Sequence, residues 1–336
     1  MFSMKRSLML LVATLFAISI AHGQVEISTF DINLNNLPDT PEIFAPGYIS
    51  TGMYERDVAI TPDGNEIYYS LFQGDWNTIM VAKKANGIWQ EPVVAPFARD
   101  TLFFYAEPAL SVDGNKIYFL STKPRENETA KPGWSNQNIW VANRNADGTW
   151  GEAEPLPENI NEFEEFFPSL TNDGTLYFTR TDAESGISQI FRSKLVGGIY
   201  QNPEKLPEPI NGKGTIFNAC IAPDESYLIG CTVGRDTANP KQATYMLFFR
   251  NADDTWADGV DLTKALGLPC PRAISISVSA DGKILFFAST AKTLEFKDLL
   301  PEWRLTSIAK RRLSPGNGNS DIYWMKIEDN FSRLRR

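Results

Sequence analysis

Histidine is almost absent from this sequence: the only one among 336 residues is His22. It lies in a segment that we expect to be cleaved, and a chain without imidazole cannot run a Ser-His-Asp or Cys-His mechanism or build a histidine-ligated zinc site. Cysteine is also scarce, since Cys220, Cys231 and Cys270 are too few for a disulfide framework. Small buried thiols are favoured over a bond between Cys220 and Cys231 across one hairpin.

Long apolar runs are confined to the N-terminus. Residues 7–20 are mainly apolar, follow two basic residues and end at small residues. This order is typical of a secretory signal peptide, and the apolar stretch is too short for a membrane span. We therefore predict a signal peptide over 1–23, an N-terminal extension over 24–39, and an exported chain that is periplasmic or secreted and has no membrane span.

Basic residues are fewer than acidic ones in this sequence. The chain has 32 basic and 41 acidic residues, and its net charge of −9 becomes −11 when the two basic residues of the signal peptide are removed. A negative surface argues against nucleic acid and against anionic membranes as partners. The exception is the run Lys310, Arg311 and Arg312.

What the sequence has in abundance is a repeat. Five segments share a short apolar run, an Asp-Gly turn and a second apolar run rich in aromatic residues, which is a hairpin pattern. In the fourth copy Glu225 replaces the glycine, so a differently built turn is predicted there. The turn aspartates, spaced by 50, 60, 51 and 57 residues, are Asp63, Asp113, Asp173, Asp224 and Asp281.

Each copy continues with a third apolar run and a turn that leads to an aromatic residue. Four short antiparallel strands per unit, repeated radially, predict an all-β fold with a single β-propeller over 40–336. Five copies favour five blades, and six stay open if 25–50 and the long insert 291–319 add strands. Segment 40–46 resembles the fourth-strand tails, so we expect it to close the ring; a fourth strand beginning at Phe331 is the other candidate.

The motifs PxLSxDGxxIYFxS, (D/N)IWVAxR and GxWxxPxxL, spread over 57–326, resemble the TolB-type, WD-repeat-like β-propeller family of exported bacterial envelope proteins. This resemblance implies a scaffold or binding protein whose partner is an envelope protein or a peptidoglycan-associated complex. It brings no catalytic residue with it. Some related propellers are enzymes, so the fold does not decide the function.

Equivalent positions six residues before each turn aspartate fall in the innermost strand of each blade. By alternation they should form a ring near one mouth of the central channel. Three interpretations stay open: solvated channel lining, a small-molecule or oligosaccharide site, and, least favoured, a calcium site on carboxylate and amide oxygens. The ring positions are Asp57, Glu107, Phe167, Asn218 and Ser275.

Two long inserts open on one face of the propeller. One spans 121–137 and carries Trp134; the other is 291–319, in which 296–303 has helical apolar spacing. Long loops in compact domains are usually functional or disordered. We interpret 291–319 as a lid or docking element over this face, with a helix merely packed against the rim as the alternative. The docking residues expected from these inserts are Trp134, Trp303, Lys310, Arg311 and Arg312.

Two functions follow from these patterns. The favoured one is a non-catalytic propeller that binds a protein or cell-envelope partner through one face, with no cofactor and no metal. The alternative is a carbohydrate-acting enzyme, a glycosidase or lyase, in which Asp57 and Glu107 act as acid and base at the channel mouth. The absence of nucleophile motifs favours binding over catalysis.

Overall fold

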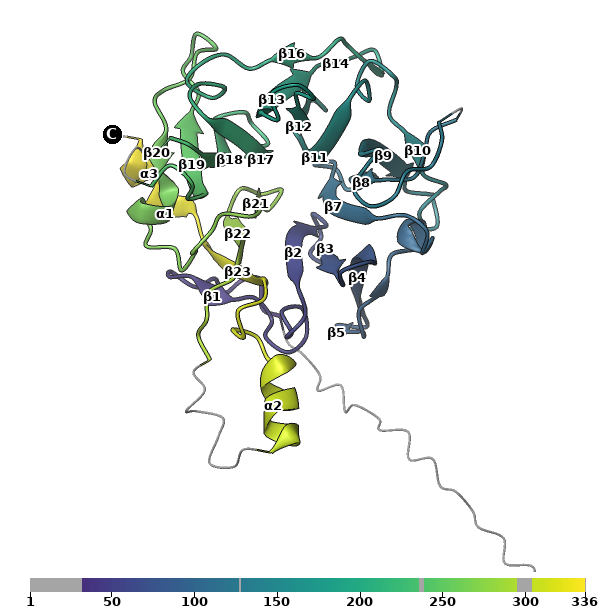
Figure 1. The fold of residues 1–336 in the computed structure, drawn as a ribbon, viewed down its shortest axis with the longest axis vertical. Coiled ribbons are helices and arrows are strands. Elements are labelled where there is room, and N and C mark those ends of the chain that lie inside the picture. The colour runs from purple at the N-terminus through teal and green to yellow at the C-terminus, as the bar shows by residue number, and fades with distance from the viewer. Residues whose placement is uncertain (1–31, 127, 236–238, 295–303, 336) are drawn as a thin grey trace, which may run out of the picture.

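Five antiparallel sheets stand around a central axis as the blades of a propeller (Figure 1). The computed structural model describes residues 32–126, 128–235, 239–294 and 304–335. The sheet topology confirms the predicted all-β propeller and, over the described residues, its five blades. The innermost strands are β2 (Glu55–Ile60), β7 (Tyr105–Leu110), β11 (Glu164–Leu170), β17 (Thr215–Ile221) and β21 (Ile276–Val278).

The two middle strands of each blade follow the inner strand through the aspartate turn. These turns lie on one face of the ring, which we call the turn face. The opposite face, where the inner strands begin, carries the connections between second and third strands and between blades; we call it the entry face. The middle strands are β3 (Glu66–Phe72) and β4 (Asn77–Ala85), β8 (Lys116–Ser121) and β9 (Asn138–Asn143), β12 (Leu176–Thr181) and β13 (Ser188–Ser193), β18 (Tyr227–Val233) and β19 (Thr244–Phe249), and β22 (Ile284–Ser289) and β23 (Asp321–Lys326).

The outer strand of the fifth blade comes from the other end of the chain. β1 pairs antiparallel with β23, which confirms the predicted closure of the ring by segment 40–46. The chain around Phe331 instead forms helix α3 (Glu328–Leu334), so a strand there was the wrong alternative, because β1 already pairs with the free edge of β23. The outer strands are β6 (Val93–Val94), β10 (Glu154–Pro155), β16 (Glu204–Lys205), β20 (Val260–Asp261) and β1 (Glu42–Ile43).

The remaining elements are short. No helix within the described ranges is long and apolar enough to cross a membrane. Besides α3, the helices and hairpin strands are η1 (Pro96–Ala98), α1 (Leu262–Ala265), α2 (Leu305–Arg312), β5 (Ile88–Trp89), β14 (Leu195–Val196) and β15 (Ile199–Tyr200).

The repeated aspartate closes its own turn. Asp113 Oδ1 accepts hydrogen bonds from Ser111 Oγ (2.5 Å) and from the backbone N–H of Asn115 (3.0 Å). These bonds hold the pKa of Asp113 below its usual value, with the Ser111 hydroxyl as the largest cause. The same pattern recurs in the first, third and fifth blades, and in the fourth the hydroxyl of Ser226, two residues after Asp224, donates instead. These aspartates therefore have a structural role of the Asx-turn kind.

Glu225 forms the same turn as the glycines that it replaces, so the expected difference in construction was wrong. Its φ is +58°, and its backbone N–H donates to Ala222 O (2.8 Å) as the glycine N–H does in the other copies. The left-handed backbone is supported by the carboxylate, which accepts from Tyr177 Oη (2.6 Å) and pairs with Arg250. Packing contacts thus replace the conformational freedom of glycine.

A similar cluster of a glutamate, a tyrosine and an arginine holds the tryptophan that follows the third strand of the second blade. Arg144 bonds Glu66 of the first blade (2.6 Å), and Tyr68 donates to the same carboxylate (2.7 Å). Trp150 Nε1 donates to Tyr68 Oη (2.7 Å), while the Arg144 guanidinium lies 4.2 Å from the Trp150 ring centroid. The cluster therefore joins neighbouring blades near the turn face.

Aromatic pairs in the middle strands fill the core on both sides of a blade. Tyr68 packs between the first and second blades, while Tyr69 packs between the first and fifth. In the fifth blade, Phe286 and Phe287 also face opposite sides. Because successive strand residues point to opposite faces, consecutive apolar residues indicate a sheet that is buried on both faces.

Candidate functional site

The predicted ring positions coincide with a β-bulge in the inner strands. Asp57, Glu107, Phe167 and Asn218 have positive φ angles of 59°, 60°, 53° and 48°, and the strand register shifts at each of them. Such a backbone costs a non-glycine residue about 1–3 kcal/mol. Ser275 lies just before β21 and is not among the residues with positive φ. All five are buried, with 1% to 8% of each residue exposed.

The backbone N–H of the bulged residue donates a hydrogen bond to a side chain of the preceding blade. Glu107 N donates to Ser70 Oγ (2.8 Å), and Asn218 N donates to Thr179 Oγ1 (3.0 Å). In the second blade the equivalent position is Leu120, which cannot accept a hydrogen bond. There the Glu107 carboxylate accepts from the N–H of Phe167 instead (2.8 Å). Part of the role of Glu107 is therefore structural.

Arg56, which the sequence analysis missed, binds both predicted carboxylates. Its Nε donates to Asp57 (2.8 Å) and its Nη2 to Glu107 (2.9 Å). Burial opposes the charge of Arg56, but Asp57 and Glu107 outweigh it and raise the pKa of the guanidinium. The available signal was a basic residue directly before Asp57 in the innermost strand of a blade. The guanidinium takes the place between these carboxylates that a bound cation would need.

Burial raises the pKa of Glu107 to about 7, although the charge of Arg56 opposes the rise. Only 9% of its side chain and 2% of the Asp57 side chain are exposed. Near neutral pH the Glu107 carboxyl can therefore gain or lose a proton. When Arg56, Asp57 and Glu107 are all ionised, the three side chains carry one net negative charge.

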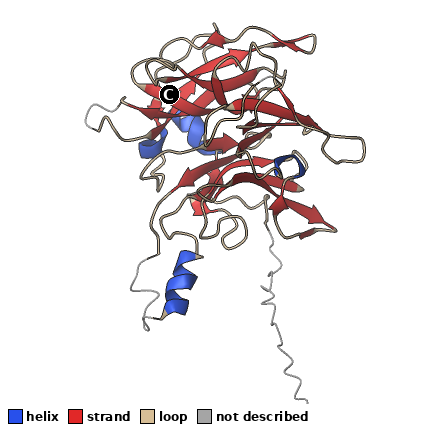
Figure 2. Ribbon diagram, turned by 45° about the vertical axis from the view of Figure 1, so that its right-hand side comes forward, coloured by secondary structure: helices blue, strands red, loops and turns tan. Residues whose placement is uncertain are grey.

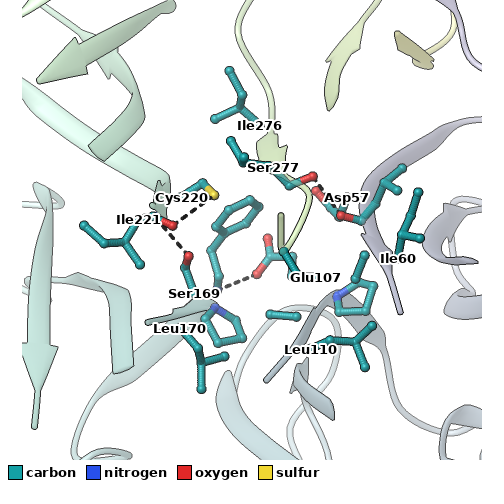
Figure 3. Close-up of a pocket in the computed structure, with 18 of the residues that line it drawn as sticks. Asp57, Ile60, Glu107, Leu110, Ser169, Leu170, Cys220, Ile221, Ile276 and Ser277 are labelled. Atoms are coloured by element: carbon teal, nitrogen blue, oxygen red, sulfur yellow. Dashed lines mark hydrogen bonds between the residues drawn. The ribbon is translucent and has the colours of Figure 1, made fainter. Parts of the chain in front are cut away.

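The central channel contains a small cavity between the bulges and the turn face (Figure 3). Its volume is about 80 Å³, which is enough space for a few water molecules. A typical pocket for a drug-sized ligand has about 300–1,000 Å³. Asp57 and Glu107 lie on its wall beside apolar side chains such as Leu110, Leu170 and Ile276. The cavity is too small for an oligosaccharide.

The other two ring positions are tied to the fifth blade. Asn218 Nδ2 donates to Ile274 O (2.7 Å), whereas its Oδ1 is buried and has no hydrogen-bond partner in the described part of the chain. Ser275 O accepts from Tyr245 Oη (2.8 Å). The structure thus links Asp57 and Glu107 through Arg56 and leaves Asn218 and Ser275 in a separate set of contacts.

Trp134 lies on the entry face and 38% of it is exposed. Its ring stacks on Phe72 (5.6 Å between centroids, 22° between planes) and meets Phe104 edge-on (4.9 Å). The Arg56 guanidinium lies 5.1 Å from the centroid of Phe72. A continuous line of contacts therefore runs from Trp134 at the surface to the ion pairs in the channel.

The other predicted docking residues lie on a different insert. Lys310, Arg311 and Arg312 form the last turn of α2, which projects from the ring, far from Trp134 in the chain (Figure 1). Trp303, and with it the whole segment expected to be helical over 296–303, lies outside the described residues. Trp134 and the basic run therefore belong to two different inserts, both of which are connections on the entry face.

The cysteines are free and buried, as the composition favoured, and no Cys220–Cys231 bond is present. Cys220 pairs across the hairpin with Ile229, and Cys231 pairs with Phe217, so the two thiols are not opposite each other. Burial raises the pKa of Cys220 to about 11, which keeps it protonated. Over the described residues, no three His, Cys, Asp or Glu side chains gather into a metal site.

Comparison with known proteins gives only distant structural similarities. No family model and no curated protein matches the sequence. TolB from Acinetobacter baumannii is 14% identical with a TM-score of 0.46; the match covers 82% of this chain and 55% of that one. A GH62 hydrolase solved with xylotriose is 9% identical with a TM-score of 0.47, covering 88% and 94%. Similarities at this level carry no information on activity.

Proposed function

We propose that this chain is an exported, non-catalytic propeller of TolB-like type that binds a protein or cell-envelope partner on its entry face. The supporting observation is where its exposed apolar side chains lie. Of twelve large apolar side chains that are exposed in the described residues, eight belong to connections on the entry face. Those eight are Met53, Leu102, Trp134, Phe163, Ile187, Leu305, Ile308 and Leu313.

The chemistry of this surface suits a protein partner. Aromatic residues, methionine and arginine are enriched in the buried centres of protein interfaces. Trp134 is held by Phe72 and Phe104, so it loses little conformational freedom when a partner covers it. The channel carboxylates support binding over catalysis, because Arg56 and the backbone already occupy their oxygens.

A capture experiment with matched variants tests this proposal. The immobilised chain is incubated with an envelope fraction and compared with two triple variants. In the first, Leu102, Trp134 and Phe163 of the entry face become serine. In the second, three exposed apolar residues of the turn face become serine: Ile88, Val196 and Ile199. We expect a partner that the turn-face variant retains and the entry-face variant loses. Equal retention by both variants would overturn the proposal.

A carbohydrate-acting enzyme is the second candidate, and one observation favours it. Asp57 and Glu107 share one guanidinium, so both carboxyls lie close together, and the pKa of Glu107 is about 7. A general acid in a glycosidase needs such a raised pKa. The test measures release of reducing ends from a panel of oligosaccharides by the chain, by Glu107→Gln and by Glu164→Gln as an exposed control. Activity lost only in Glu107→Gln would support catalysis.

A further inference from the structure

Helix α2 is largely exposed, and only Ser307 and Arg311 in it are partly buried. None of its residues from Leu305 to Arg312 is buried, and Leu305 and Ile308 are 80% and 49% exposed. Leu313, which follows the helix, is 65% exposed. Leu305, Ile308 and Ala309 are three and four residues apart, so they lie on one side of the helix. An eight-residue helix is marginal by itself, and this one buries no apolar side in its own propeller.

The C-terminal end of α2 is nevertheless fixed to the ring. Asn317 Nδ2 donates both to Arg312 O (2.8 Å) and to Gly52 O (2.9 Å). At Gly52 a Cβ would lie 2.1 Å from Arg312 O, so only glycine allows this approach. The helix therefore projects from a defined base (Figures 1 and 2). A fixed, projecting helix with an exposed apolar side has the geometry of an element that inserts into a partner.

The charge of α2 points to the kind of partner. Residues 304–313 contain four basic residues and no acidic one, in a chain whose net charge is −9. Three of the four, Lys310, Arg311 and Arg312, lie in the last turn of the helix, where the helix dipole favours positive charge, and Arg304 is at its N-cap. A complementary surface would be acidic and would also offer an exposed apolar side chain.

The chain itself carries such a surface. Residues 145–179 contain no Lys or Arg. Within this segment, five exposed glutamates run from the outer strand of the second blade to the inner strand of the third. Phe163, which is 52% exposed, lies among them. We call these glutamates the acidic strip: Glu152, Glu154, Glu158, Glu162 and Glu164.

We propose that α2 docks on the acidic strip of a second copy of this chain. Blades two and three lie across the ring from α2 (Figure 1). The helix therefore cannot contact the acidic strip of its own molecule. The contact joins two different surfaces and is therefore head-to-tail, which leads to a closed ring or to an open chain of copies. Leu305 and Ile308 would pack near Phe163 while the basic run faces the glutamates. The proposal rests on part of the proposed function, namely that α2 is a docking element.

Sedimentation of the purified chain tests this contact. One helix makes a small interface, so we expect weak association, with a Kd of about 10–100 µM at low salt. The mean mass should rise with concentration at about 0.02 M salt and return to that of the monomer at about 0.5 M. Reversing the helix charges (Lys310→Glu/Arg311→Glu/Arg312→Glu) should weaken association at least tenfold. A control of equal charge change, Lys116→Glu/Lys194→Glu/Lys241→Glu, alters exposed lysines elsewhere and should not.

A charge swap makes the test specific. Glu152→Lys/Glu154→Lys/Glu158→Lys should also lose self-association, and mixing it with the helix-reversed variant should restore a complex. Leu305→Ser/Ile308→Ser keeps every charge and should weaken association severalfold, with circular dichroism to confirm folding. A chain that stays monomeric at low salt, or a swap that restores nothing, would overturn the proposal. Since no envelope fraction is present, that failure would leave the proposed function standing.

Discussion

Glu55 and Glu165 occupy the same place in two different blades. Each lies near the start of an inner strand and is buried, with 1% and 0% of the residue exposed. The residue directly opposite on the second strand differs: Leu71 faces Glu55, whereas Arg180 faces Glu165 and bonds it at 2.7 Å. The first blade therefore buries an unpaired carboxyl where the third blade buries an ion pair.

The two environments raise the pKa of the buried glutamate by different amounts. Burial raises the pKa of Glu55 to about 8, helped by the charge of Asp321 and opposed by the Thr51 hydroxyl. Burial also raises the pKa of Glu165, but Arg180 limits the rise to about 7. Glu55 Oε2 has no hydrogen-bond partner in the described ranges. A buried carboxyl without a cation is best accommodated as the neutral acid.

The sign of the pH effect follows from these shifts. Both carboxyls have pKa values above the usual 4.5, so the folded protein binds their protons more tightly than the unfolded chain does. Their contribution to stability is complete below about pH 4.5 and is lost as the pH rises toward the folded pKa. For Glu55 that window extends from about pH 4.5 to about pH 8. Glu55 lies where the ring closes, since its N–H donates to Ser320 O of the last blade (2.9 Å).

Arg180→Leu should have the largest effect, because it makes the third blade resemble the first. Removing one partner of a buried pair costs about 3–5 kcal/mol. Arg180 also donates to Ile160 O (3.1 Å), which adds to the loss. We expect urea unfolding at pH 8 to show this destabilisation and a smaller one at pH 5, where Glu165 is neutral. The double variant Arg180→Leu/Glu165→Gln should recover much of the stability at pH 8. No recovery would mean that the arginine acts mainly through packing.

Replacing each glutamate by glutamine should have opposite effects at pH 8. Glu165→Gln leaves Arg180 without its counter-charge, so stability should fall by about 1–3 kcal/mol. Glu55→Gln removes a carboxyl that is forced to ionise, so stability should rise by a similar order. At pH 5 Glu55→Gln should differ little from the parent chain. Thermal unfolding across pH 5 to 9 measures both, and the same sign for the two variants would refute the comparison.

Leu71→Arg supplies the first blade with the cation of the third. The new guanidinium should lower the pKa of Glu55, so the stability lost between pH 5 and pH 8 should shrink by about 1 kcal/mol. The measurement is the difference between urea unfolding free energies at the two pH values, which cancels a uniform packing cost. Leu71→Met is the matched control for side-chain length. An equal pH dependence in both variants would show that the arginine does not reach Glu55.

The coupling between Asp321 and Glu55, tested with Asp321→Asn, should be the smallest effect. The charge of Asp321 contributes to the raised pKa of Glu55, and burial raises the pKa of Asp321 itself to about 6. Asparagine keeps an oxygen that can accept from Gly316 N, which now donates to the carboxylate (2.7 Å). Removal of the titrating Asp321 should itself raise stability at pH 8 over pH 5 by about 1 kcal/mol, and the coupling to Glu55 should add about 0.5 kcal/mol. A double-mutant cycle with Glu55→Gln isolates the coupling, and an additive cycle would exclude contact between the two charges.

Local sequence determined the repeat and four of its five turns, and it favoured five blades over six. Each aspartate turn is closed by residues within two positions of Asp113 and its counterparts, so a short motif contains all the information for it. Alternating apolar runs likewise predict strands without reference to distant residues. Even the closing strand at 40–46 was visible because it resembles the other outer strands. These features rest on contacts that are short in sequence or repeated.

Only the tertiary structure decided what each repeated position does. Arg56 meets Glu107 from 51 residues away, Arg180 rather than Leu71 faces a buried glutamate, and a bulge turns regular alternation into a ring of buried residues. No local pattern distinguishes Glu55 from Glu165. Their difference arises from the one residue across the strand pair, because the energy of a buried charge depends on its nearest partner in space and not on its place in the repeat.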